Sequence, residues 1–154
     1  MSYELWINSP QEEILRKELL QEKMLSEGWE IRFLADDAFS GDRGVGLLPS
    51  VGPLDKHVLL AGWPIKQANS NLLAQLFSQG DAEQLEEVFM DEDAFSTCSL
   101  SVSNSDQDNV KTEYHFRLRG IGIVSGWELT HSVWEAIGTL SNGELVNPQQ
   151  DGEE

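Results

Sequence analysis

Acidic side chains dominate the stretch from residue 81 to residue 93, which we expect to form a short helix. Leu85, Val88 and Phe89 recur at helical spacing and would form its inner side. No lysine or arginine occurs between residues 67 and 110. A solvated face is the ordinary interpretation, and a patch that binds a basic partner is the alternative. The candidate partner-binding residues are Glu83, Glu86, Glu87, Asp91, Glu92 and Asp93.

A second group of residues could line a small-molecule pocket. The glycine- and proline-rich segment 36–56 is long for a loop in a compact domain, and loops of this length are often functional. His115 and Arg117 fall on the polar side of an alternating strand, and Trp63 follows a short apolar strand. We therefore consider a pocket beneath the 36–56 loop, lined by Trp63, His115 and Arg117, as the alternative site.

The motifs that usually mark catalytic and cofactor sites do not occur in the sequence. It contains no Gly-x-Ser-x-Gly, no His-Glu-x-x-His and no phosphate-binding loop. The three histidines, His57, His115 and His131, are far apart along the chain. The acids of the 36–56 loop match no dedicated calcium or zinc spacing. The sequence thus predicts no metal and no cofactor, and it favours binding over catalysis.

The overall charge narrows the classes of partner. Acidic residues number 27 and basic residues 10, which gives a net charge of −17. Such a surface disfavours nucleic acid and anionic membranes, which bind clusters of lysine and arginine. The single cysteine, Cys98, excludes an internal disulfide, and we expect it to be buried in a strand. Without a leader or an apolar run of about 20 residues, the chain is expected to be soluble and cytoplasmic.

The elements that would position these residues begin with a strand–helix–strand unit over residues 3–34. Ser9 and Glu12 have the spacing of a capping box, which predicts that the helix begins at Pro10. Gly28 would end this helix in a left-handed conformation. The two strands of such a unit should run parallel. Charged residues, Lys17 among them, should face water, and the buried stripe should comprise Ile14, Leu15, Leu19, Leu20, Met24 and Leu25.

The middle of the chain is expected to contain one strand and two helices. The strand covers residues 57–62, and the helices cover about 67–78 and 81–93. A hairpin should follow, with strands over 95–103 and 110–123 joined by a polar turn. Its alternation predicts a wet face that carries His115 and Arg117 and a buried face with Cys98, Leu100, Val102, Thr112, Tyr114 and Phe116.

The end of the chain repeats the pattern of its beginning. Ser125 and Glu128 again have capping-box spacing, and they precede a helix that Asn142-Gly143 should end. Its buried stripe would comprise Leu129, Val133, Ala136, Ile137 and Leu140, with Trp127 and Trp134 as a second stripe. A short strand over residues 144–147 should close the chain.

These patterns predict one α+β domain over residues 1–150. Its two βαβ-like units favour a ferredoxin-like or related sandwich, in which residues 36–94 form an inserted loop and two-helix segment. The last residues, 151–154, should form a disordered acidic tail.

The C-terminal segment carries one resemblance to known proteins. Residues 140–152 read Leu-Ser-Asn-Gly-Glu-Leu-Val-Asn-Pro-Gln-Gln-Asp-Gly. This ending resembles that of some small bacterial α+β proteins of uncharacterised or toxin-immunity type, which close with Gly-Gly, a short strand and Asp-Pro-Gln-x-Gly. Asn142 stands for the first glycine and Asn147 for the aspartate. The motif describes a helix stop and a strand end, so no functional residue carries over.

We therefore expect a non-enzymatic acidic module that binds a basic protein, with an immunity-like inhibitor as the specific form that the resemblance suggests. The alternative is a small-molecule-binding protein or enzyme that uses the pocket described above. A third expectation is a homodimer formed through exposed Trp6 or Trp127.

Overall fold

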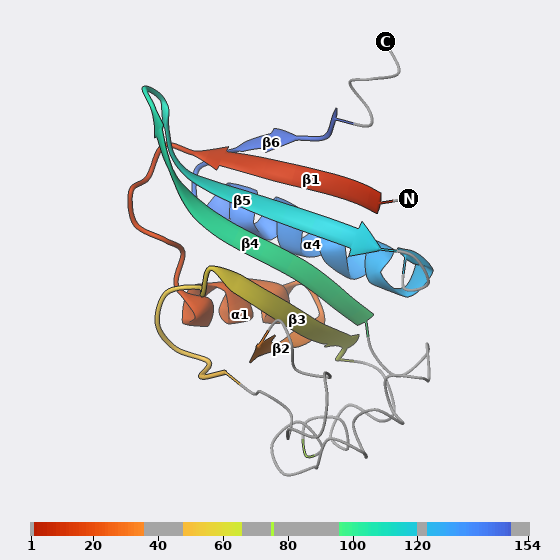
Figure 1. Cartoon of the computed structure of the whole chain (residues 1–154). Helices are drawn as coiled ribbons and strands as arrows, with labels where there is room; N and C mark the ends of the chain where they lie inside the picture. Colours follow the sequence, from red (N-terminus) through yellow and green to blue (C-terminus); the bar gives the residue numbers. More distant parts are fainter. Residues whose placement is uncertain (1, 36–47, 66–74, 76–95, 120–122, 149–154) are drawn as a thin grey trace.

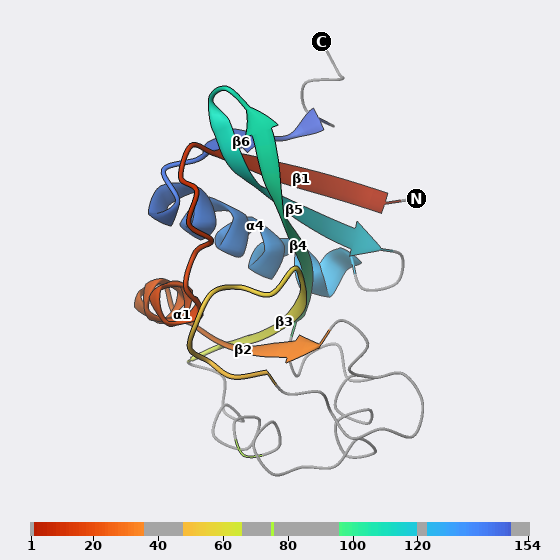
Figure 2. The same ribbon diagram turned by 60° about the vertical axis from the view of Figure 1, so that its left-hand side comes forward.

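The computed structural model describes residues 2–35, 48–65, 75, 96–119 and 123–148. In this part of the chain, six antiparallel strands form one sheet in the order β2-β3-β4-β5-β1-β6. Figures 1 and 2 show the two described helices, α1 and α4, against the same face of the sheet. The elements are β1 (Ser2–Ser9), α1 (Lys17–Ser26), β2 (Trp29–Ala35), β3 (His57–Pro64), β4 (Ser96–Gln107), β5 (Val110–Arg119), α4 (Ile123–Leu140) and β6 (Glu144–Val146).

The predicted α+β class is confirmed, and so are the parallel directions within both strand–helix–strand units. Three antiparallel neighbours separate β1 from β2, so these two strands run the same way. One strand, β1, separates β5 from β6, with the same consequence. A ferredoxin-like sheet has four strands. The present sheet has β3 and β4 in addition: the segment expected as an insertion contributes β3, and the first strand of the predicted hairpin contributes β4.

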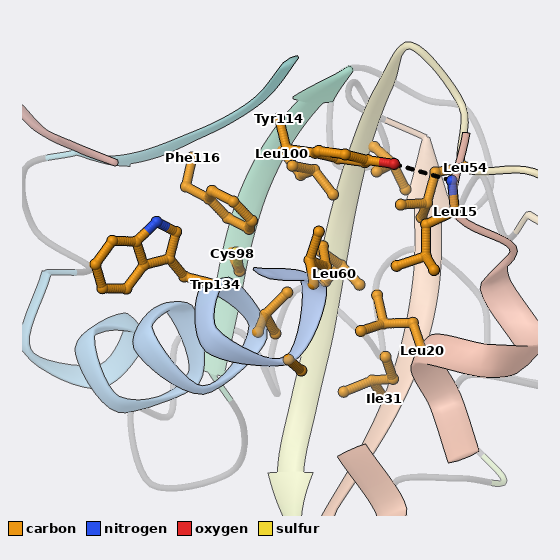
Figure 3. Close-up of a cluster of buried hydrophobic side chains, with 14 of the residues drawn as sticks. Leu15, Leu20, Ile31, Leu54, Leu60, Cys98, Leu100, Tyr114, Phe116 and Trp134 are labelled. Atoms are coloured by element: carbon orange, nitrogen blue, oxygen red, sulfur yellow. Dashed lines mark hydrogen bonds between the residues drawn. The ribbon is translucent and has the colours of Figure 1, made fainter. Parts of the chain in front are cut away.

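The core lies between the sheet and the two helices. Strand alternation brings Leu5 and Leu100 to either side of Phe116, and Leu60 opposite Cys98. These side chains are buried, as the hairpin pattern predicts (Figure 3). The helices cover them with Leu20, Met24, Leu129, Val133, Ala136 and Ile137.

The helix α1 begins at Lys17, so the capping box predicted at Ser9 and Glu12 is wrong. Ser9 is instead the last residue of β1. Its hydroxyl donates to the carbonyl of Ser141 at 2.8 Å and accepts from the amide of Gln11 at 3.2 Å. The capping oxygen is therefore used to join β1 to the end of α4.

Tertiary hydrogen bonds explain why residues 10–16 do not form a helix. The Leu15 amide donates to the Tyr114 hydroxyl at 3.0 Å, and the Leu15 carbonyl accepts from the Leu54 amide at the same distance. The Thr112 hydroxyl donates to the carbonyl of Gln11 at 2.7 Å. These contacts satisfy backbone groups that a helix would otherwise pair internally. The sheet and the 48–56 segment thus override the local capping signal.

The capping box predicted at Ser125 and Glu128 is also wrong, because the helix begins before Ser125. The helix α4 begins at Ile123, so Ser125 is its third residue and does not occupy the cap. The strand β5 ends at Arg119. Residues 120–122 lie outside the described part of the chain.

The predicted helix stops are confirmed. Gly28 has φ +93° at the end of α1, and Asn142 has φ +57° after α4. Gly143 follows because space is short: a Cβ there would collide with Cγ2 of Ile7 and lie 2.9 Å from the Ser141 hydroxyl.

None of the described helices combines the length and the apolar character that crossing a bilayer requires.

The predicted stripe of α1 is too wide. Leu20 and Met24 are fully buried, whereas Leu19 is 46% exposed and Leu25 is 54% exposed. Ile14 and Leu15 reach the core from the non-helical segment, so α1 itself needs only a narrow inner side. Two large apolar side chains are consequently left on its surface.

We predict that Tyr114→Phe destabilises the protein by about 1–3 kcal/mol, because it leaves the buried Leu15 amide without an acceptor (Figure 3). Urea unfolding measures the change. Ser103→Ala removes a hydroxyl from an exposed position of β4 and should cost less than about 0.5 kcal/mol. Equal costs for the two variants would contradict the role assigned to the phenol.

Candidate functional site

A shallow groove lies beside α1 at the edge of the sheet that β2 forms. Its volume is about 330 Å³. We call it the α1–β2 groove, and it is lined by Glu18, Gln21, Glu22, Leu25, Glu30, Ile31 and Arg32. The helical residues recur at intervals of three and four, so they share one side of α1. The groove therefore combines acidic groups, one amide and an exposed leucine.

Two of the three glutamates in the groove are compensated within the chain. The Arg16 guanidinium lies 3.1 Å from Glu18, and this hydrogen bond is the main reason why the pKa of Glu18 is lowered. The guanidinium of Arg32 lies 2.8 Å from Glu30. Glu22 is exposed, and no ion pair within the described residues reaches its carboxylate. Among the described residues, the groove thus keeps one negative charge without a cationic partner.

A buried lysine holds α1 against the 48–56 segment. Lys17 Nζ lies 2.8 Å from Asp55 Oδ2, donates to the Pro49 carbonyl at 3.0 Å and lies 5.5 Å from the centre of the Phe33 ring. The Lys17 side chain is 3% exposed, whereas that of Asp55 is 46% exposed. The expectation that Lys17 faces water is wrong, because its partners come from a segment that local periodicity does not place.

A second polar cluster lies on the sheet face opposite the helices. Strand register sets Glu4 opposite Arg117 and Trp6 opposite His115, and we call these four residues the outer-face cluster. Glu4 Oε1 accepts from Arg117 Nη2 at 3.2 Å and lies 3.0 Å from His115 Nε2. The rings of Trp6 and His115 are stacked with centroids 4.4 Å apart. Strand alternation correctly predicted that His115 and Arg117 lie on this face. It did not predict that they contact Glu4 and Trp6.

The structure brings two of the three predicted pocket residues together. His115 and Arg117 both contact Glu4. Trp63 is fully buried and lies opposite Glu30 in the register of β2 and β3. The first part of the loop, residues 36–47, lies outside the described residues, so a pocket beneath it stays a prediction.

The acidic candidates at 83–93 also lie outside the described part of the chain, together with all of the helix expected over 67–78 except residue 75. Their role in binding a partner stays a prediction. Of the two tryptophans proposed for a homodimer, Trp127 is 40% exposed. Trp6 is partly buried, and its ring stacks on that of His115. The homodimer therefore also remains a prediction.

The other two histidines, His57 and His131, contact neither the groove nor the outer-face cluster in the bonds that follow. His131 Nδ1 donates to the Trp127 carbonyl at 2.9 Å, and its ring lies between the indoles of Trp127 and Trp134. His57 Nδ1 lies 3.1 Å from the Ser101 hydroxyl. Among the residues that the structure describes, no three histidine, cysteine, aspartate or glutamate side chains gather as a metal site would require.

Comparison of the chain with protein-family models, with curated proteins and with solved structures finds no match. The function must therefore be argued from the geometry and charge of the chain itself.

We predict that Cys98 in the folded protein resists N-ethylmaleimide at pH 8 and is labelled once per chain after unfolding. Cys98 is buried, and burial raises the pKa of its thiol from 9.0 to about 12. Mass spectrometry measures the labelling. Rapid labelling of the folded chain would contradict the burial of this residue.

The same shift makes folding sensitive to alkaline pH. Between pH 9 and about 12, the unfolded chain loses the thiol proton while the folded chain keeps it. The contribution of Cys98 to stability is thus complete below pH 9 and falls as the pH rises towards 12. Cys98→Ala should weaken the alkaline decline in the free energy of unfolding.

Proposed function

We propose that this protein is a non-enzymatic module that binds a basic protein. The observation that carries the proposal is the acidic α1–β2 groove, where Leu25 is exposed beside Glu18, Glu22 and Glu30. Protein–protein contacts combine an apolar centre with a polar rim, and Leu25 would supply the apolar centre here. The carboxylate of Glu22, which no described cation pairs with, indicates a basic partner.

The charge of the whole chain supports the same class of partner. A net charge of −17 would repel another acidic surface and accelerate encounters with a basic one. The acids of residues 81–93 would add to this attraction. The resemblance of the C-terminal segment to toxin-immunity-type proteins favours an inhibitor of a basic protein as the specific form of the module.

We expect a basic protein captured at low ionic strength to bind the purified chain with an affinity that falls as salt is added. Raising the ionic strength from about 0.05 M to about 0.5 M shortens the screening length severalfold, which weakens attraction between exposed charges. Calorimetry with the purified partner measures the dissociation constant. Replacing Glu86, Glu87, Asp91 and Glu92 with their amides should raise it by about tenfold or more.

The matched control replaces four exposed acids elsewhere in the chain with their amides: Glu12, Glu13, Asp106 and Asp108. This variant has the same net charge, so a similar loss of affinity would reveal only general attraction. A complex that is insensitive to salt and to both variants would contradict the proposal.

A second candidate function is the binding of a small anionic molecule at the outer-face cluster. It is favoured by the positioning of His115 and Arg117, whose side chains converge on Glu4 at the sheet surface. A ligand at 100 times its dissociation constant should stabilise the fold by about 2.7 kcal/mol. Thermal-shift screening against carboxylates and phosphates tests this, and Arg117→Gln should abolish any response. A flat response across the screen would contradict it.

A further inference from the structure

We infer that the α1–β2 groove receives one arginine or lysine side chain of the partner protein and that Glu22 is the carboxylate that binds its charge. This inference rests on the proposed function and assigns the anchor point of the contact.

Glu22 is the acceptor because the other charges around the groove are already committed. Glu18 accepts from Arg16 and from the Gly52 amide at 3.1 Å each. Arg32 donates to Glu30 at 2.8 Å and to the Ile31 carbonyl at 2.9 Å. Its guanidinium also lies 5.7 Å from the Trp63 ring. Arg32 is therefore held away from Glu22, and no described cation neutralises that carboxylate.

Gln21 adds a second acceptor to the groove. Its Nε2 donates to the Ile31 carbonyl at 3.1 Å and to the Ser50 hydroxyl at 3.4 Å. These contacts fix the side-chain amide between α1 and β2. Since the nitrogen is occupied, the amide oxygen is the group left to accept a hydrogen bond. An incoming ammonium or guanidinium group, which has donors only, matches this set of acceptors.

Leu25 makes the groove suitable for a long side chain rather than for a bare ion. More than half of the surface of Leu25 is exposed. This residue lies on the same side of α1 as Glu18, Gln21 and Glu22, at the C-terminal end of the groove. Arginine and lysine bury their aliphatic stems on such surfaces while the charged head remains in a polar setting. A volume of about 330 Å³ lies at the lower end of small-molecule pockets, which suits a single side chain.

The test uses N-acetyl-arginine methylamide as the probe and the citrulline analogue, which has the same shape without the charge, as its control. Titration of the isotope-labelled full chain is followed by NMR. We expect saturable shifts at Gln21, Glu22 and Leu25 with the arginine probe and none with citrulline. Glu22→Gln and Leu25→Ser should each weaken binding by about threefold to fivefold, as expected for an exposed charge pair and a small apolar contact.

Glu135→Gln is the matched control, since Glu135 is also an exposed glutamate on a helix. Equal effects of Glu22→Gln and Glu135→Gln, or equal shifts with both probes, would overturn the inference. So would concentration-dependent shifts of residues 18–32 without probe, because they would place a second copy of the chain in the groove.

The inference and the proposed function fail in different ways. If a basic protein binds the chain but Glu22→Gln and Leu25→Ser leave its affinity unchanged, the module stands and the anchor point is wrong. If the arginine probe binds in the groove but no basic protein does, the groove has been assigned correctly and the proposed function is wrong.

Discussion

The hydrogen bond from the Leu15 amide to the Tyr114 hydroxyl is the contact on which the placement of α1 depends. Tyr114 is fully buried on the helix side of β5, so its hydroxyl presents an acceptor inside the core. A buried amide must find a partner, and this one finds it on the sheet instead of in a helix. The chain between β1 and α1 is thereby committed to the core, and the helix can form only after it.

The late start of α1 determines which side chains lie on the surface as well as which ones are buried. Because α1 starts at Lys17, its inner side needs only Leu20 and Met24, and Leu25 is left beside the acids of the groove. Lys17 adds the second constraint. A buried ammonium group is costly unless it is paired, and here Asp55 and the Pro49 carbonyl offset that cost. The lysine thus fastens α1 to the 48–56 segment, whose Gly52 amide also donates to Glu18.

Local pattern predicted the parts of this protein that depend on local physics. Alternation identified the buried faces of the strands, and the left-handed conformations at Gly28 and Asn142 ended the helices as expected. The start of α1 was missed, because Ser9 bonds to Ser141, a residue 132 positions away, which no local motif anticipates. The groove was missed for the same reason: it joins a side of α1 to a strand edge, and neither half has a distinctive sequence signal.

The proposed docking of a basic protein on the α1–β2 groove can be tested by hydrogen exchange of the complex, measured peptide by peptide. Amides of α1 and β2 should exchange more slowly when the partner is bound, while those of the exposed side of α4 should exchange at an unchanged rate. Protection confined to α4 or to the outer face of the sheet, with α1 and β2 unchanged, would contradict this docking.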